Sequence, residues 1–263
     1  MKKLIKKQYV VLLAFYMTGS LFAANSDGKT GEPSDMNETD NINTHITMNE
    51  NLNLTQEWDK VFPKSDKVNH SKVTFRNRYG IVLAADLYVP KEANGKLPAI
   101  AVSGPFGAVK EQSSGLYAQT LAERGFLTIA FDPSYTGESG GEPRYVASPD
   151  INTEDFCAAV DFLSTCDNID PERIGILGIC GWGGMAINAA AIDTRIKATV
   201  ASTMYDMGRV NANGYFDAMD AGKRYELRRQ LNAQRTIDAK NGMYALAGGV
   251  VDPLPDDAPQ FVK

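Results

Sequence analysis

The sequence predicts an α/β fold, in which a mostly parallel sheet carries helices on both of its faces. Short apolar runs without polar alternation recur along the chain, as expected of strands whose two faces are both covered. Segments with apolar residues at helical spacing separate these runs. Two alternating strands joined by a short turn come before the first such run. The pattern therefore indicates a leading hairpin followed by βαβ units.

The hairpin is predicted from residues 72–75 and 82–89, with its turn at residues 77–80. Apolar side chains alternate with others along residues 82–89, which is typical of a strand with one buried face. A polar turn at residues 91–96 then leads into the first buried strand.

Strands and helices are predicted to take turns after the hairpin. The predicted strands are residues 98–103, 126–131, 174–179 and 196–202, and the predicted helices are residues 115–124, a helix opening at 152 and residues 183–191. Asn152 opens its helix in capping style, with apolar residues at i, i+3, i+4 and i+7 from Phe156. Right-handed crossovers place such helices on both sheet faces.

A leading hairpin followed by βαβ units is the strand order of the α/β-hydrolase fold, a three-layer sandwich. By this count residues 196–202 form strand six. We find no further strand pair in the pattern before Lys263, so the sequence predicts that the last strands of that fold are missing. Residues 196–202 would then form a sheet edge with a single charge, Lys197, and we expect self-association.

Residues 1–24 are predicted to be a signal peptide. Four lysines among the first seven residues precede a mostly apolar stretch of about 15 residues, whereas a membrane span needs about 20. We expect export to the periplasm or the exterior, with no stable membrane span after cleavage. An uncleaved signal anchor in the membrane is the alternative.

Two further regions follow the signal peptide. Residues 25–56 are polar and lack periodicity, so they are predicted to be a disordered linker. Residues 57–263 are assigned to the α/β domain, with a lid-like helical segment at residues 211–247.

Composition and charge narrow the function classes. Of the 263 residues, 43% are hydrophobic and 22% are charged, which is ordinary for a globular domain. The net charge is −5 and no run of Lys and Arg exceeds two, which argues against nucleic acid as a partner. The three cysteines, Cys157, Cys166 and Cys180, form neither a disulfide framework nor a CxxC pair that would indicate a metal.

The chemistry is predicted to lie where the strand at residues 174–179 meets the next helix. Cys180 stands between an apolar strand and an Ala-rich helix, with glycines close on both sides. Glycines let the backbone turn tightly, and a helix N-terminus favours the negative charge of a thiolate. We therefore predict a nucleophile elbow with Cys180 as the catalytic nucleophile. The glycines assigned to this elbow are Gly178, Gly183 and Gly184.

The alternative interpretation of this stretch is a buried cysteine before a glycine-rich turn. Trp182 occupies the position two after Cys180, where the usual motif has glycine. We expect this indole to narrow the acyl pocket.

The strand at residues 98–103 leads into a candidate oxyanion loop, Gly104-Pro105-Phe106-Gly107. The backbone N–H groups of Phe106 or Gly107, together with that of Gly181, are predicted to bind a developing oxyanion. The alternative is that Gly104 and Pro105 form an ordinary turn.

Five stretches carry a resemblance to a known group: residues 107–112 (GAVKEQ), 117–118 (YA), 131–144 (FDPSYTGESGGEPR), 170–175 (DPERIG) and the elbow at 178–190. From about residue 73 to residue 209, the sequence resembles the bacterial α/β hydrolases of the dienelactone-hydrolase-like and polyketide-transferase-like type. The resemblance implies attack by Cys180 on an ester or other acyl carbon, a covalent acyl-enzyme, and neither a metal nor an organic cofactor. The sequence departs from that group at Gly104, where many relatives have His, and at Trp182, where many have a small residue.

A thiol nucleophile needs a base, which the α/β-hydrolase fold usually supplies as a histidine after strand eight, with an acid after strand seven. The two histidines are His45, in the predicted linker, and His70, which precedes the first predicted strand and is expected on the surface. Asp206 follows strand six and is a candidate for the acid. Asp132 and Glu138 are expected to shape the loop after the strand at residues 126–131.

Two hypotheses from different classes follow. In the first, the chain is the N-terminal portion of a Cys-dependent acyl hydrolase or transferase, with a small-molecule acyl substrate and its His and Asp beyond Lys263. That chain by itself is expected to be inactive or very weak. In the second, the chain is a non-catalytic relative that serves as a binding or interaction domain. We favour the first hypothesis, because the elbow is present.

Overall fold

The computed structural model describes residues 52–247 of the chain. The predicted signal peptide, residues 25–51 of the predicted linker and residues 248–263 lie outside the described residues. The strands are β1 (Val68–Arg76), β2 (Val82–Pro90), β3 (Leu97–Ser103), β4 (Leu127–Phe131), β5 (Ile169–Ile179) and β6 (Ile196–Ser202). The helices are α1 (Ser113–Ala122), α2 (Pro149–Ser164), α3 (Gly181–Ile192), α4 (Met207–Asn213) and α5 (Ala221–Asn241), with a 3-10 turn, η1, at Tyr215–Asp217.

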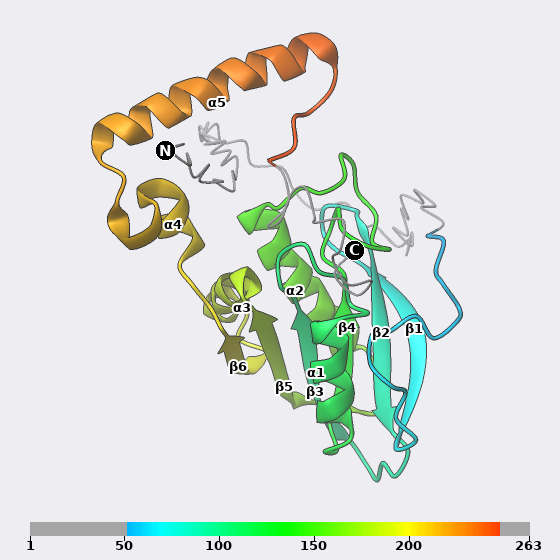
Figure 1. Cartoon of the computed structure of the whole chain (residues 1–263). Coiled ribbons are helices and arrows are strands. Elements are labelled where there is room, and N and C mark those ends of the chain that lie inside the picture. The colour runs from blue at the N-terminus through cyan, green and yellow to red at the C-terminus, as the bar shows by residue number, and fades with distance from the viewer. Residues whose placement is uncertain (1–51, 248–263) are drawn as a thin grey trace, which may run out of the picture.

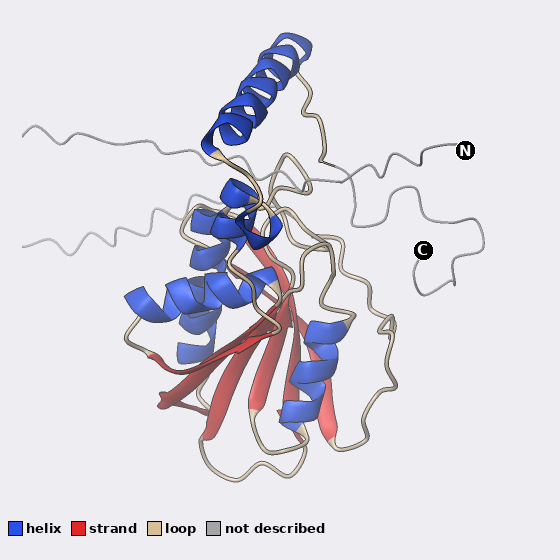
Figure 2. Ribbon diagram, turned by 60° about the vertical axis from the view of Figure 1, so that its left-hand side comes forward, coloured by secondary structure: helices blue, strands red, loops and turns tan. Residues whose placement is uncertain are grey.

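The six strands form one sheet in the order β1-β2-β4-β3-β5-β6. β1 pairs antiparallel with β2, and β2 pairs antiparallel with β4, whereas β4, β3, β5 and β6 are parallel to one another. Helix α1 covers one face of this sheet, and α2 and α3 cover the other (Figures 1 and 2). The predicted fold class, a three-layer α/β sandwich with a leading hairpin, is confirmed.

Two hydrophobic clusters join the three layers. Between the sheet and α2 and α3, side chains such as Ile129, Phe156 and Met185 pack together. Between the sheet and α1, Val102 and Ala118 belong to a second cluster. Every residue of β4 is buried, which explains why its sequence is apolar without alternation.

Helix α2 begins earlier than the sequence predicts. Its N-cap is Ser148, whose Oγ accepts a hydrogen bond from Ile151 N, so the capping role predicted for Asn152 is wrong. Asn152 is buried inside the helix and donates to Asp155 Oδ2 at 3.0 Å. Asp155 Oδ1 also accepts from Asn77 Nδ2 at 2.8 Å. Asn152 and Asp155 therefore do not cap the helix. Through Asp155 they connect α2 by a hydrogen bond to Asn77, in the turn between β1 and β2.

The surface position expected for His70 is also wrong. Strand β1 begins at Val68, so His70 lies within the hairpin, where it pairs with Tyr88. Its side chain is 12% exposed, and Nε2 lies 2.7 Å from Asp86 Oδ1. The ring of Trp58 packs edge-on against it, with centroids 5.1 Å apart. β1 thus begins four residues before the strand predicted at residues 72–75.

The ordered domain begins before residue 57. Residues 52–56, which the sequence places in the disordered linker, form an irregular segment. Within it, Thr55 N–H donates to Glu138 Oε1 at 2.6 Å. A contact to the loop after β4 thus fixes the end of the predicted linker.

The predicted helical segment at residues 211–247 contains only the last three residues of α4, then η1 and α5. None of the 21 residues of α5 is buried, and the helix lies apart from the sheet in both views (Figures 1 and 2). Ion pairs at helical spacing, such as Glu226 with Arg229, line its surface. Among the helices within residues 52–247, none has both the length and the apolar composition needed to cross a membrane.

Strand β6 is an edge of the sheet as far as the structure describes it. It pairs with β5 alone in residues 52–247, and most of its residues are exposed. Beside it lies an apolar groove of about 320 Å³ on the α1 face, whose lining includes Ile100, Leu121, Phe126, Ala198 and Val200. Unpaired backbone groups and open apolar surface therefore occur together at β6.

We expect the 263-residue chain to self-associate through β6, because an open strand edge is a template for pairing with another chain. Light scattering on a size-exclusion column should show a mass that rises with protein concentration. Val200→Lys should reduce this association, because Val200 is 52% exposed on β6. Ile237→Lys, at a site 50% exposed on α5, should not. A cooperative monomer at every concentration would contradict the expectation.

Candidate active site

Cys180 lies at the tip of the turn between β5 and α3. Its backbone has φ 58° and ψ −126°, a region that residues with a side chain rarely adopt. Its N–H donates to Ser202 O at 2.8 Å, and its C=O accepts from Gly183 N at 3.0 Å. These bonds hold the residue at the carboxyl ends of β5 and β6. A strained strand-to-helix turn of this kind is the geometry of a nucleophile elbow.

Three of the glycines around Cys180 allow close approach. A Cβ at Gly178 would overlap the carbonyl oxygen of Trp182, and one at Gly181 would overlap the ring of Phe106. At Gly183 a Cβ would lie 2.9 Å from Met204 Cβ. The fourth glycine, Gly184, has open space at this position, so no close approach requires it.

The candidate oxyanion loop lies directly against the elbow. Gly104 has φ 97°, and a Cβ there would lie 2.5 Å from Ile179 O and 2.8 Å from Trp182 Cβ. The rings of Phe106 and Trp182 meet edge to face, with centroids 4.3 Å apart. Gly104 and Trp182 therefore face each other, and the tryptophan fills the space that a side chain at position 104 would need. Trp182 itself is 3% exposed and belongs to the core beneath the loop.

The candidate oxyanion donors come from two segments that touch. Gly181 is the first residue of α3, so its N–H has no acceptor within the helix. Phe106 and Gly107 are the central residues of a turn closed by the hydrogen bond from Ala108 N to Pro105 O. The N–H groups of Phe106 and Gly107 take no part in that hydrogen bond. The structure thus brings Gly181 and Phe106 together beside Cys180, and Gly107 follows in the same turn.

A buried ammonium group anchors this loop. Lys110 Nζ lies 2.6 Å from Glu111 Oε1, 2.8 Å from Asp132 Oδ2 and 2.7 Å from Glu138 Oε2. The backbone N–H of Lys110 also donates to Asp132 Oδ1 at 2.8 Å, and that of Glu138 donates to Asp132 Oδ2 at 2.9 Å. The expectation that Asp132 and Glu138 shape the loop after β4 is confirmed, and the same contacts fix the end of the candidate oxyanion loop.

The charges in this cluster shift one another's pKa. Burial by itself would lower the pKa of Lys110, but the facing charges of Asp132 and Glu111 outweigh it and raise that pKa. Burial would raise the pKa of Glu138, but hydrogen bonds from Lys110, Lys72 and Thr55 lower it to about 2. Both groups are therefore charged at neutral pH.

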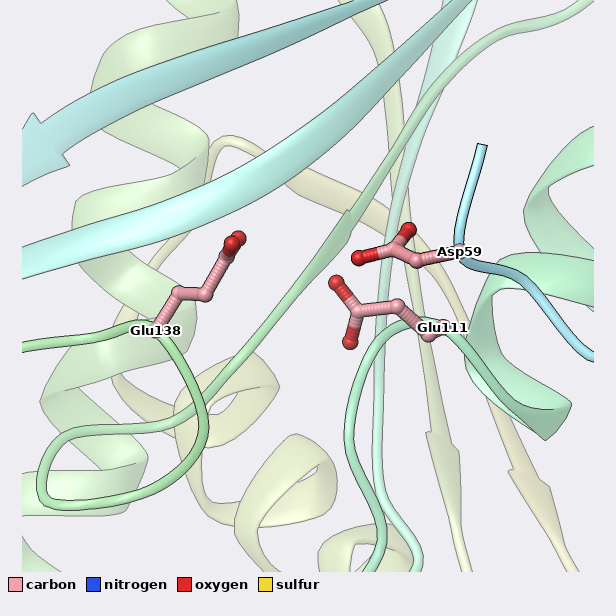
Figure 3. A group of neighbouring side chains, drawn as sticks. All are labelled: Asp59, Glu111 and Glu138. Atoms are coloured by element: carbon pink, nitrogen blue, oxygen red, sulfur yellow. The ribbon is translucent and has the colours of Figure 1, made fainter. Parts of the chain in front are cut away.

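Three carboxylates in the same region point toward a common space (Figure 3). Oxygen atoms of Asp59, Glu111 and Glu138 lie within 4.8 Å of one another, close enough for a metal ion. Lysine ammonium groups already pair with all three: Lys60 with Asp59 at 2.7 Å, Lys110 with Glu111 and Glu138, and Lys72 with Glu138 at 2.5 Å. The group is thus part of an ion-pair network.

The segment after β6 also contacts the elbow, which the sequence pattern did not single out. Met204 lies against Gly183, and Met207 lies against Gly181. Tyr205 lies between them in the chain, and burial together with the nearby Cys180 raises its pKa. The sequence could have indicated this contact, because Tyr205 follows closely after a predicted strand that neighbours β5. The carboxyl ends of parallel strands meet at one edge of a sheet.

Asp206, the candidate acid, is the N-cap of α4. Its Oδ1 accepts a hydrogen bond from Arg209 N at 2.9 Å. The carboxylate is thereby engaged in holding the start of α4.

His70 lies far from Cys180. His70 on β1 is paired with Tyr88 on β2, and Tyr88 is paired with Thr128 on β4. Thr128 is paired with Ile100 on β3, which is paired with Gly175 on β5. Four strand spacings of about 4.8 Å and five residues of about 3.3 Å along β5 separate the two side chains by roughly 25 Å. Within residues 52–247 the sole histidine is therefore out of reach of the thiol.

Comparison with known proteins identifies relatives of this architecture. The model of a family described as X-Pro dipeptidyl-peptidase (S15 family) matches residues 79–246. A Pseudomonas aeruginosa protein called "Uncharacterized protein PA2218" is 67% identical over 195 residues, which are 74% of this chain and 53% of that protein. Its crystal structure has a TM-score of 0.76 at 63% identity, covering 81% of this chain and 67% of that one.

Two fungal relatives carry functional names. A protein of Aspergillus aculeatus named "Thiohydrolase aneE" is 37% identical over 136 residues, covering 52% of this chain and 42% of that protein. The "Alpha/beta hydrolase GrgF" of Penicillium shares the fold, with a TM-score of 0.57 at 22% identity, covering 68% of this chain and 57% of that one. The chain spans about half the length of the curated relatives it matches.

Glu138→Gln should lower the melting temperature at pH 7, because it removes a carboxylate that faces Lys110 and Lys72. The pKa of Glu138 is lowered from 4.5 to about 2, so this contribution is present above pH 4.5 and is lost as the pH falls toward 2. The difference from wild type should narrow over that range. Glu226→Gln, which breaks an exposed pair on α5, should change little at any pH. A difference that stays constant with pH would contradict this account.

Cys180 should be the first thiol that iodoacetamide labels in the folded chain. Burial and the charge of Asp193 raise the pKa of Cys157 to about 11, and burial and the charge of Asp167 raise that of Cys166. Both therefore hold few thiolates at neutral pH. Mass mapping after brief treatment would locate the label. Preferential labelling of Cys157 or Cys166 would argue against the elbow assignment.

Proposed function

The chain belongs to the α/β-hydrolase family described as X-Pro dipeptidyl-peptidase (S15 family), and from this premise we propose that Cys180 is its nucleophile in the hydrolysis of acyl substrates. The observation that carries the proposal is the strained backbone of Cys180 at the N-terminus of α3, in contact with the oxyanion loop. Such a turn costs free energy, and it is usually kept where chemistry needs it.

The reaction follows from this arrangement. The thiolate of Cys180 attacks the carbonyl carbon of an ester or thioester, and the carbonyl electron pair moves to the oxygen. The N–H groups of Gly181 and of Phe106 or Gly107 stabilise this oxyanion. When the carbonyl re-forms, the alkoxide or thiolate leaves and takes up a proton. Water then attacks the acyl-enzyme, which releases the acid and restores the Cys180 thiol.

We propose an ester or thioester as the substrate, in preference to a peptide bond. The Aspergillus relative named as a thiohydrolase matches 52% of this chain, which supports acyl transfer from sulfur or oxygen. A thiolate attacks such carbonyls readily, and the leaving alkoxide or thiolate is better than an amine that still needs a proton.

We propose that the general base comes from outside residues 52–247. His70 is roughly 25 Å from Cys180 by strand geometry, and Asp206 is engaged as a helix cap. Without a base, the rate of an acyl-transfer step falls by roughly 10²–10⁴. Residues 52–247 alone would then accept an acyl group on Cys180 and release it slowly.

Reaction of the 263-residue chain with p-nitrophenyl acetate tests this proposal. We expect a burst of p-nitrophenol approaching one equivalent, followed by slow turnover, with an acetyl group on Cys180 in the intact mass and peptide map. Cys180→Ala should abolish the burst. Cys166→Ala, which removes another partly exposed thiol, should leave it unchanged.

Three outcomes would contradict parts of the proposal. An unchanged burst in Cys180→Ala would place the reactive group elsewhere. A folded chain that takes up no acetyl group would favour the hypothesis of a binding domain. Rapid steady turnover that depends on Cys180 would show instead that the chain supplies its own base.

A further inference from the structure

We propose that Met207 is a positioning residue for the candidate oxyanion hole, because its thioether packs against Gly181 and Phe106 where these two residues meet. The proposal rests on the proposed role of Cys180 as nucleophile, and it adds a residue that acts through the candidate donors. Methionine carries neither a charge nor an acidic proton, so Met207 itself takes part in no proton transfer.

The three residues are packed together at one point. A Cβ at Gly181 would overlap both the sulfur of Met207 and the ring of Phe106, so both side chains lie against the same face of this glycine. The sulfur and the ring are therefore neighbours of each other, and thioether sulfur makes favourable contacts with aromatic rings. Phe106 and Met207 are both half-buried, and both pack against the core between the sheet and the helices α2 and α3. Phe106 also meets Trp182 edge to face in this core.

The chain fixes Met207 from two directions. Before it, the carbonyl of Ser202 at the end of β6 accepts a hydrogen bond from Cys180 N at 2.8 Å. After it, α4 begins with Met207 itself, and the N-cap Asp206 accepts a hydrogen bond from Arg209 N at 2.9 Å. A strand end and a helix cap thus hold the thioether against the elbow.

The two candidate donors belong to separate segments, so a further contact is needed to fix the distance between them. Gly181 begins α3, whereas Phe106 lies in the loop that follows β3. The ion pairs of Lys110 fix the end of this loop, four residues past Phe106. Gly181 has no side chain with which to hold Phe106, and Met207 supplies that contact from a third segment. Donors stabilise an oxyanion when they are already in place, and a displacement of about 1 Å can slow a reaction about a hundredfold.

The test compares two reactions of the same thiol in the 263-residue chain. Acetylation of Cys180 by p-nitrophenyl acetate passes through an oxyanion, whereas alkylation by iodoacetamide displaces iodide and puts no new charge on a carbonyl oxygen. Met207→Ala should therefore slow the acetylation burst roughly tenfold to a hundredfold and leave the alkylation rate close to that of wild type. A change in the access to Cys180, or in its thiolate fraction, would change both rates alike.

Two further variants and a second thiol serve as controls. Met207→Leu keeps most of the side-chain volume, so it should restore most of the acetylation rate. Met219→Ala removes another half-buried methionine of the segment after β6, beside Gly214, and should leave the ratio of the two rates unchanged. Cys157 is buried, so it should stay unlabelled by brief iodoacetamide treatment in each variant that folds normally.

The outcome is separable from that of the proposed function. If Cys180 is acetylated but the ratio of the two rates is the same in wild type and Met207→Ala, the role of Met207 fails alone. Acetylation as slow in Met207→Leu as in Met207→Ala would also overturn a role that rests on packing. A wild-type chain that takes up no acetyl group would remove the proposed function, and with it the role of Met207.

Discussion

The buried ammonium of Lys110 is the interaction on which the site depends. A charge without access to water must be surrounded by opposite charge, and Lys110 has three carboxylates within 2.8 Å. They come from its own loop, from the end of β4 and from the loop that follows. Buried ion pairs add little net stability, but loss of one partner is costly, so the pairing selects one geometry for these loops. The candidate oxyanion loop, which directly precedes Lys110, is held in place by this requirement.

Because this loop is fixed, its backbone can approach the turn at Cys180 more closely than side chains at the contact points would allow. Gly104 meets Ile179 O and Trp182, and Gly181 meets the ring of Phe106, at distances that exclude a Cβ. The backbone strain at Cys180 is offset by its hydrogen bonds to Ser202 and Gly183. The ion-pair network and the glycines therefore serve one arrangement, in which the loop at residues 104–107 packs directly against the turn at Cys180.

Features that depend on local pattern were predictable from the sequence, and features that depend on distant pairing were not. β4 and the Cys180 turn are local: an unbroken apolar run and a glycine-rich strand end identify them. The pairing of His70 with Asp86 depends on the hairpin register, so a residue expected on the surface is buried. Asn152 resembles a helix cap, yet it is buried inside α2 beside Asp155, which receives hydrogen bonds from a turn 78 residues away. Tyr205 was missed for the same reason, since only the sheet brings β6 beside β5.

The sheet order also limits where a base for the proposed nucleophile Cys180 could lie. β1 and β2 are too distant from β5 for a side chain on them to reach Cys180, and α1, α2 and α3 pack on the two faces below the elbow. In the proposed mechanism, a base would therefore approach from the loops at the carboxyl ends of the strands or from the β6 side. An element that paired with β6 would stand two strand spacings, about 10 Å, from β5. That distance is within reach of a histidine on a loop after such a strand. Within the described residues, the open edge of β6 and Cys180 thus lie on the same side of the molecule.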